Sequence, residues 1–240
     1  MKNILLIGCG ETGSAIKQVE EEAGNNVQIA EIDSKPDTDT LFDVMHVCIP
    51  YSDKFSRIAL KYVLEYSPKL TMIHSTVKVG TTEQLSNQIG YIVHSPIRGV
   101  HPHLYEGVKE FVKYVGGDED AAELAIKHLE SIGVEPYYLG SAKTTEFAKI
   151  LSTTYYGWNI LFTKYAKKMC DKLKLDYDKV YTHPNRTYNF GYAGLGIEHV
   201  CRPVLYPLHG KIGGHCISQN FELLPESLLK DIVKELNEKD

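Results

Sequence analysis

Residues 8–13 read Gly-Cys-Gly-Glu-Thr-Gly, and they directly follow an apolar run over residues 3–7. Glycines at this spacing between a strand and a helix are typical of a dinucleotide-binding turn. Gly8 permits the tight turn, Gly10 lets a pyrophosphate approach the backbone, and Gly13 lets the helix lie close to the strand. The alternative is a glycine-rich turn without a ligand. The expected cofactor contacts in this turn are Gly8, Gly10, Glu11, Thr12 and Gly13.

Acidic residues end the second expected strand, residues 27–32. A carboxylate about twenty residues beyond the glycines is where a Rossmann fold binds the ribose hydroxyls. Glu31 fits this offset better than Asp33, although either acid could be a solvated strand end. No Lys or Arg stands beside Glu31 to accept a 2′-phosphate, and Lys35 is the nearest cation. We therefore expect NAD rather than NADP.

Composition excludes several classes of protein. A hydrophobic content of 43% and a charged content of 24% over 240 residues indicate a globular protein with an ample core. The net negative charge of −5 does not indicate binding to nucleic acid or to an anionic membrane. No apolar run reaches the roughly 18–20 residues of a membrane span. Five cysteines without paired spacing favour a reducing compartment, so we expect a cytoplasmic protein without a signal peptide.

Apolar runs alternate with helical segments along the first part of the chain, which is typical of a parallel sheet covered on both faces. The expected strands are 3–8, 27–32, 44–49, 70–74, 91–94, 111–116 and 134–139. The expected helices are 12–23, 53–65, 80–89, 118–131 and 143–172. The sequence thus predicts an α/β fold, a doubly wound Rossmann domain with a mainly parallel sheet over 1–140. A small helical domain over 141–240 is expected to follow it.

The segment 143–172 is longer than a crossover helix requires. Its apolar residues recur every three or four positions, and they are Phe147, Leu151, Thr154, Trp158, Leu161, Tyr165 and Met169. Such a stripe predicts a core helix, a dimer interface, or both, and we expect a homodimer. An irregular stretch is expected over 182–215, followed by one amphipathic helix at about 220–238.

Chemistry in a doubly wound sheet occurs at the carboxyl ends of the strands. Three segments end there and are expected to face the nicotinamide side of the cleft: 49–52, 74–82 and 94–99. From these segments the expected cofactor contacts are Pro50, Tyr51, Ser75 and Thr76, and Arg98 is an expected substrate contact.

Lys149 and Cys216 are the candidates for reacting groups. Lys149 either pairs with Glu146 on the helix surface or projects into the cleft as a proton-transfer or oxyanion-stabilising group. Cys216 follows a glycine-rich loop and precedes a helix, which favours a thiolate, although most free cysteines are small buried hydrophobes. The spacings of His215 and Cys216, and of His199 and Cys201, match no zinc pattern, so no metal is expected.

Several motifs together resemble the UDP-glucose/GDP-mannose dehydrogenase family, within the wider 6-phosphogluconate dehydrogenase-like group. Residues 75–82 resemble its S-T-V-x-x-G-T segment, Glu146 to Lys149 resemble its E-x-x-K helix, and Arg202 with 213–216 resembles its Arg…G-G-x-C loop. The resemblance implies an NAD-dependent dehydrogenase in which Cys216 captures an aldehyde and Lys149 stabilises the oxyanion. The catalytic set that it implies is Cys216, Lys149, Thr76 and Asn220. The substrate contacts that it implies are Arg98, Thr153, Arg202, Gly213 and Gly214.

The chain departs from this family in three places. Ile97 replaces the acid of its S-P-E motif, Thr153 stands at its Asn, and Asn220 stands at its second acid. We also expect a shortened form without the C-terminal domain that binds the nucleotide of the sugar. The sequence therefore predicts NAD-dependent oxidation of an alcohol on a small polar, sugar-like substrate. The alternatives are a lysine-only 3-hydroxyacid-type dehydrogenase and a non-catalytic dinucleotide-binding sensor or regulatory protein.

Overall fold

The structure is a computed structural model that describes residues 1–31, 34–212 and 217–239. The chain divides into two compact units, Met1–Lys149 and Ile150–Asp240. The long helix α6, Ala142–Leu173, begins in the first unit and ends in the second. Each unit is described in turn.

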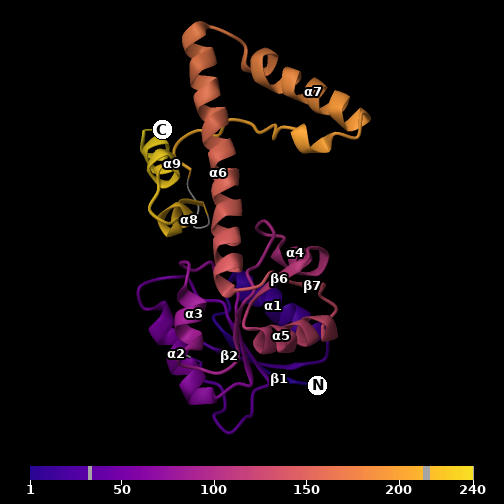
Figure 1. The fold of residues 1–240 in the computed structure, drawn as a ribbon, viewed down its shortest axis with the longest axis vertical. Coiled ribbons are helices and arrows are strands. Elements are labelled where there is room, and N and C mark those ends of the chain that lie inside the picture. Colours follow the sequence, from indigo (N-terminus) through magenta and orange to yellow (C-terminus); the bar gives the residue numbers. More distant parts are fainter. Residues whose placement is uncertain (32–33, 213–216, 240) are drawn as a thin grey trace. The chain divides into compact units, whose positions relative to one another are not determined.

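The first unit is built on a seven-stranded sheet in the order β2-β1-β3-β4-β5-β6-β7 (Figure 1). The strands are β1 Asn3–Ile7, β2 Asn26–Ala30, β3 Val44–Val47, β4 Leu70–Ile73, β5 Ile92–His94, β6 Lys113–Gly117 and β7 Pro136–Tyr138. Strands β2 to β5 pair in parallel, whereas β6 runs antiparallel to β5. The strand order reverses at β1, which lies between β2 and β3, and such a switch point is where doubly wound sheets bind ligands. The predicted Rossmann-type fold with a mainly parallel sheet is confirmed.

Helices cover both faces of this sheet, and each face has its own apolar core (Figure 1). On one face pack α1 Glu11–Glu22, α4 Leu104–Glu110 and α5 Glu119–Ser131. On the other face pack α2 Phe55–Tyr66 and α3 Thr81–Ser86. The central strands β1, β3, β4 and β5 are buried on both sides, which is why they read as continuous apolar runs rather than alternating ones. The sequence analysis missed α4, because its seven residues are too few to show a helical period.

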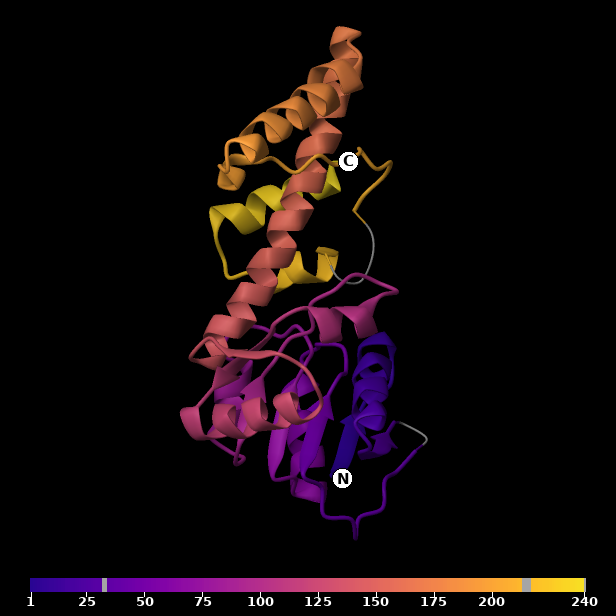
Figure 2. The same ribbon diagram turned by 90° about the vertical axis from the view of Figure 1, so that its right-hand side faces the viewer.

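The second unit contains the rest of α6 with α7 His183–Gly194, α8 Ile217–Leu223 and α9 Leu228–Glu238. A π-helical turn at Asp178–Thr182 and a 3₁₀ turn at Glu198–Val200 flank α7. Helices α8 and α9 lie beside α6 in both views (Figures 1 and 2), and the Tyr165 hydroxyl on α6 donates to the carbonyl oxygen of Leu236 at 3.0 Å.

Two expectations for the second unit were wrong. The stretch expected to be irregular contains α7, a helix with no buried residue and therefore no apolar period to read. The single final helix is two helices, separated at Pro225 and restarted where the Ser227 hydroxyl accepts the Lys230 N–H.

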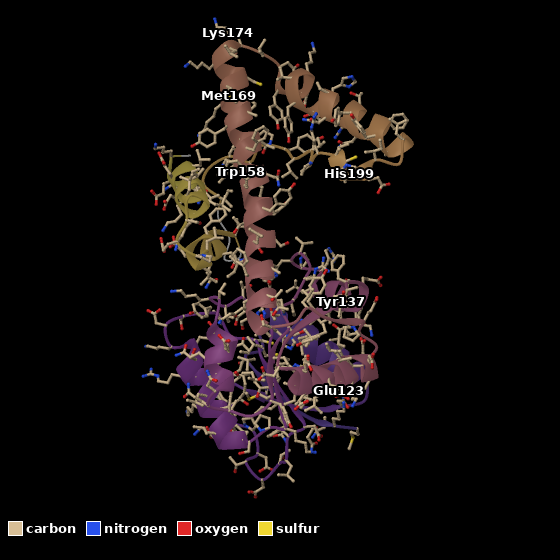
Figure 3. The ribbon with its side chains drawn as sticks, viewed as in Figure 1. Glu123, Tyr137, Trp158, Met169, Lys174 and His199 are labelled. Carbon is tan, nitrogen blue, oxygen red and sulfur yellow. The ribbon has the colours of Figure 1, made fainter. Side chains whose placement is uncertain are left out.

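The predicted apolar stripe of α6 lies along the edge of its buried face rather than in the middle. Thr154 and Leu161 on one side of the stripe are buried. Leu151 and Met169 on its other side are exposed, and Figure 3 shows Trp158 and Met169 on this helix. No helix in the described ranges has the length and hydropathy needed to cross a membrane.

Candidate functional site

The glycine turn after β1 has the close packing that its sequence predicts. Gly8 has φ of +84°, and a Cβ there would lie 2.9 Å from Ile49 Cγ2. A Cβ on Gly13 would collide with the carbonyl oxygen of Gly8, so α1 can approach β1 only with glycine at that position. A Cβ on Gly10, by contrast, would meet no atom within 4 Å. The backbone at Gly10 is therefore open to an incoming group.

Helix α1 begins at this turn without a side-chain cap, and Gly10 is its N-cap. The first N–H groups of a helix have no intrahelical acceptor, so they are available to an anion. Glu11 in the first turn is exposed, and its carboxylate forms an ion pair with His101. Thr12 follows it and is partly buried.

Glu31 lies against the glycine turn. Its Oε1 accepts the backbone N–H of Cys9 at 2.9 Å, which brings the carboxylate from the end of β2 to the end of β1. An exposed carboxylate held in this way can accept hydroxyl groups with its remaining lone pairs. Asp33, the second candidate, lies outside the described residues.

The ends of β3 and β4 are joined by Ser75. Its hydroxyl donates to the carbonyl oxygen of Ile49 at 2.6 Å, one residue before Pro50. Pro50 is exposed, and Tyr51 and Thr76 are partly buried. The predicted contacts from these two segments therefore lie at neighbouring strand ends of the first unit.

Glu146 and Lys149 do not form the surface pair that was one of the sequence-based alternatives. The carboxylate of Glu146 is buried and accepts the N–H groups of Gly80 at 2.6 Å and Thr82 at 2.8 Å. Burial raises the pKa of this carboxyl, while the two N–H groups and Thr82 act against that rise. Glu146 thereby holds the loop that follows Ser75 and Thr76.

Lys149 reaches in the opposite direction, and its Nζ donates to the carbonyl oxygen of Ile97 at 2.8 Å. Ile97 follows the carboxyl end of β5, so the ammonium group lies at the edge of the sheet where the glycine turn also lies.

His94 is an unsuitable proton acceptor for chemistry at this edge. It is buried, its Nε2 donates to the carbonyl oxygen of Ser75 at 3.1 Å, and its Nδ1 lies 2.9 Å from the Thr145 hydroxyl. Burial lowers the pKa of this imidazole to about 3. His94 therefore connects the loop at Ser75 to the start of α6.

Arg98 is exposed and turns toward β6. Its guanidinium lies 4.8 Å from the ring centre of Tyr114 and 5.5 Å from that of Phe111, and Nη1 donates to the carbonyl oxygen of Val112 at 3.4 Å. These contacts account for its position without a substrate, so its predicted role in substrate binding stays a prediction.

The remaining predicted residues belong to the second unit. Arg202 is exposed, stacks 3.7 Å from the ring centre of Tyr188, and is held through its backbone by Asn189. Thr153 is partly buried on α6, and Asn220 is buried on α8. Gly213, Gly214 and Cys216 lie outside the described residues.

A chain of buried polar side chains crosses the core of the first unit, and the sequence analysis missed it. It runs through Lys113, His74, His46, Glu20 and His128 and ends at Lys2. Polar residues inside apolar strands, such as His46 between Met45 and Val47, are the signal that could have revealed it.

Within the described ranges, Glu20, His46 and His128 of this chain form the cluster with the ligand types of a metal site. Oε1 of Glu20 accepts from Nε2 of His46 at 2.9 Å and from Nε2 of His128 at 2.7 Å. These are hydrogen-bond distances, whereas two ligand atoms on a tetrahedral zinc are about 3.3 Å apart. At these distances the three side chains form a buried hydrogen-bonded cluster.

No protein-family model matches the chain. The UDP-N-acetyl-D-mannosamine dehydrogenase of Methanocaldococcus jannaschii is 28% identical over 155 residues, which cover 62% of this chain and 33% of that protein. Over this stretch the chain is similar in sequence to a nucleotide-sugar dehydrogenase. It spans about a third of the length of this curated relative.

Solved structures show how far the fold is shared. The UDP-D-ManNAc dehydrogenase of Pyrococcus horikoshii has a TM-score of 0.78 at 19% identity, over 99% of this chain and 68% of that chain. The 3-hydroxyisobutyrate dehydrogenase of Mycobacterium tuberculosis has a TM-score of 0.73 at 16% identity, over 100% of this chain and 93% of that chain. The fold of this chain is thus similar to that of both a sugar dehydrogenase and a hydroxyacid dehydrogenase.

We predict that Glu146→Ala lowers the free energy of unfolding by about 2–4 kcal/mol, because it leaves two backbone N–H groups unpaired. Glu146→Gln keeps an acceptor oxygen and should lose less than half as much. The matched control is Glu83→Ala, since Glu83 is an exposed carboxylate paired with Lys143 and should contribute under about 1 kcal/mol. Urea unfolding measures all three variants, and equal losses for Glu146→Ala and Glu83→Ala would contradict the assignment.

Proposed function

We propose that this chain is an NAD-dependent dehydrogenase that oxidises an alcohol on a small polar, sugar-like substrate. The observation that supports it most is the position of Lys149. Its Nζ is held by the carbonyl of Ile97 at the end of β5, and the glycine turn ends β1 at the same edge of the sheet. A proton-accepting group and a cofactor turn at one sheet edge are what alcohol oxidation requires.

The residues of the turn fit a dinucleotide. The open backbone at Gly10 gives a pyrophosphate room, and the first N–H groups of α1 would bind it. Glu31 would accept the ribose hydroxyls, and Pro50, Tyr51 and Ser75 would line the nicotinamide end. A 2′-phosphate would meet the carboxylate of Glu31, which favours NAD over NADP.

NAD, when bound, supplies the acceptor for the hydride that leaves the alcohol carbon. The chain has to remove the hydroxyl proton, and the neutral amine of Lys149 would accept it as the C–O bond becomes a carbonyl. The resulting ammonium stays paired with the carbonyl oxygen of Ile97 and can donate to the new carbonyl of the product. Thr76, on the loop that Glu146 holds, would orient the substrate hydroxyl.

We predict that NAD binds at least tenfold tighter than NADP, because a carboxylate repels a 2′-phosphate. Titration calorimetry with both cofactors measures this ratio, and Glu31→Ala should reduce it. Gly10→Val should abolish binding of both cofactors without lowering the unfolding midpoint, since a Cβ at Gly10 meets nothing within 4 Å. Equal affinities of the wild-type chain for NAD and NADP would refute the role of Glu31.

We predict that Lys149→Met lowers kcat by about 10² to 10⁴ and changes the affinity for NAD by less than about twofold. Cys216→Ala should retain the first hydride transfer, which needs the lysine but no thiol. NADH absorbance measures both variants, with UDP-N-acetyl-D-mannosamine and 3-hydroxyisobutyrate as the two probe alcohols. Full activity in Lys149→Met would exclude the lysine as the proton acceptor.

Counting NADH per product tests the role of Cys216, which stays a prediction from the sequence. Ile97 and Asn220 cannot activate water for thioester hydrolysis, so one NADH per product or a slowly released acyl group on Cys216 is expected. Intact-mass spectrometry detects the acyl group. Two NADH with rapid carboxylate release would contradict this expectation and show that another base replaces the missing acids.

A hydroxyacid dehydrogenase without a cysteine step is the second candidate. The fold resembles that of the mycobacterial 3-hydroxyisobutyrate dehydrogenase about as closely as that of the Pyrococcus sugar dehydrogenase, with TM-scores of 0.73 and 0.78. Oxidation of 3-hydroxyisobutyrate and not of the nucleotide sugar would favour this candidate. NAD binding without turnover of any alcohol would instead favour the non-catalytic sensor.

The exposed side of α6 supports a homodimer. Leu151, Tyr155, Phe162 and Met169 are all exposed, and their spacing places them on one line of the helix. A continuous apolar line of this length is costly to leave in water. The proposed partner is a second copy of this chain, packed along that line.

We predict by light scattering a mass of about twice the 27.0 kDa of one chain. Met169→Glu should shift the mass toward that of a monomer, because it places a charge in the apolar line. Ser152→Glu is the matched control, since Ser152 is exposed on a different side of α6. A monomeric wild-type chain at micromolar concentration would contradict the proposed dimer.

A further inference from the structure

Lys113 is a buried lysine at the edge of the sheet where the chemistry is proposed. It is 2% exposed, although it is the first residue of β6. Its position follows from the direction of that strand: β6 runs antiparallel to β5, with His94 opposite Gly116. The start of β6 therefore lies at the carboxyl end of β5, whereas a parallel strand would begin at the opposite edge of the sheet.

Two lysines contact three successive carbonyl groups at this edge. Nζ of Lys113 donates to the carbonyl oxygens of Ser95 and, at 2.9 Å, of Pro96. Nζ of Lys149 donates to the next carbonyl oxygen, that of Ile97, at 2.8 Å. The family acid that Ile97 replaces would have placed a negative charge in this segment. Both ammonium groups donate to peptide carbonyls of this one segment, and each cation raises the cost of charging the other.

The titratable groups that interact electrostatically with Lys113 come from several elements packed around it. His46 lies in β3 and Cys48 directly follows that strand. The others are His74 after β4, His94 at the end of β5 and Lys149 on α6. Burial lowers the pKa of each of the three imidazoles and raises the pKa of the Cys48 thiol to about 12. All four groups are therefore neutral near pH 7, which leaves Lys149 as the charged neighbour among them.

The polar chain behind Lys113 gives it a defined position in the core. Nδ1 of His74 lies 3.1 Å from Nζ of Lys113 and 2.7 Å from the carbonyl oxygen of Ser95. Nε2 of His74 lies 2.7 Å from Nδ1 of His46, whose Nε2 donates to the ionised Glu20. Burial, together with the Lys149 ammonium, lowers the pKa of Lys113 to about 7.

We propose that Lys113 is a positioning residue for Lys149: it holds the segment 95–97 that carries the carbonyl partner of Lys149, and its positive charge favours the neutral amine of Lys149. The inference rests on the proposed function, in which Lys149 must be neutral to accept the proton of the alcohol. Electrostatic coupling between two groups is mutual. Because the charge of Lys149 favours the neutral form of Lys113, the charge of Lys113 also favours the neutral form of Lys149. Because Lys113 is almost fully buried, it would act through Lys149.

The test measures the amine of Lys149 directly, without substrate. Acetic anhydride acylates neutral amines, and peptide mass spectrometry gives the labelling rate of Lys149 from about pH 6 to pH 10. In Lys113→Met the rate at a pH near 6.5, where Lys113 still carries most of its charge, should fall by roughly threefold or more relative to the exposed Lys54 in the same sample, because a nearby like charge is lost. Lys113→Arg keeps the charge and should retain most of the wild-type rate.

Lys2→Met is the matched control, since it removes a cation from the far end of the same polar chain. It should leave the labelling of Lys149 unchanged. An equal or faster rate in a folded Lys113→Met chain would overturn the proposal, and so would an equal fall in Lys2→Met. Circular dichroism establishes whether each variant is folded.

The wild-type chain supplies a readout if Lys113→Met does not fold. Two coupled lysines titrate over a broader pH range than one isolated group, so the labelling curve of Lys149 should be broadened. A curve with the slope of a single independent site would contradict the coupling. Labelling needs neither cofactor nor turnover. If the labelling shows that Lys113 and Lys149 are coupled but the chain produces no NADH, only the proposed function is rejected. Turnover with an unchanged pH profile in Lys113→Met would reject only the role of Lys113.

Discussion

The parallel ladder between the central strands continues one residue beyond each strand, and the candidate site depends on that continuation. Gly8 donates to Ala30, Cys48 to Ile7, His74 to Val47 and Ser95 to Ile73, each through the backbone. These bonds hold the first residue after each strand in line with its neighbour. As a result the glycine turn, the segment at Pro50, the loop at Ser75 and the segment at Ile97 all leave the sheet at one edge. Residues far apart in the sequence can then form one site.

Two side chains from the first turns of α6, one buried and one partly buried, connect that edge to the helix. Glu146 binds the N–H groups of Gly80 and Thr82, and Lys149 binds the carbonyl of Ile97. The carboxylate accepts from the donors of one loop, and the ammonium donates to the acceptor of the next segment. Because a buried unpaired N–H or carbonyl is costly, these two contacts stabilise the loops and orient the lysine at the same time.

The same rule applies inside the sheet, where polar side chains replace apolar ones. Glu20 accepts from His46, His128 and Asn25. Burial raises the pKa of its carboxyl, but the bonds from His128 and His46 outweigh it and hold the pKa well below its usual value. A buried carboxylate is tolerated only with such partners. Replacing this network with apolar residues would remove the polar connection between His74 and Glu20, and with it the buried support of Lys113.

The sequence by itself determined the sheet, the glycine turn and the candidate lysine, because local apolar runs and glycine spacing carry that information. All seven strands overlap the predicted runs, and the central ones are easiest to recognise because strands buried on both faces are continuously apolar. Helix α7 was missed because a helix without a buried face leaves no apolar period. Tertiary structure alone decided the partners of Glu146 and Lys149, which are three residues apart but bond to different loops. It also decided the antiparallel direction of β6 and hence the place of Lys113, because strand direction depends on the path of the chain between strands and not on the residues within them.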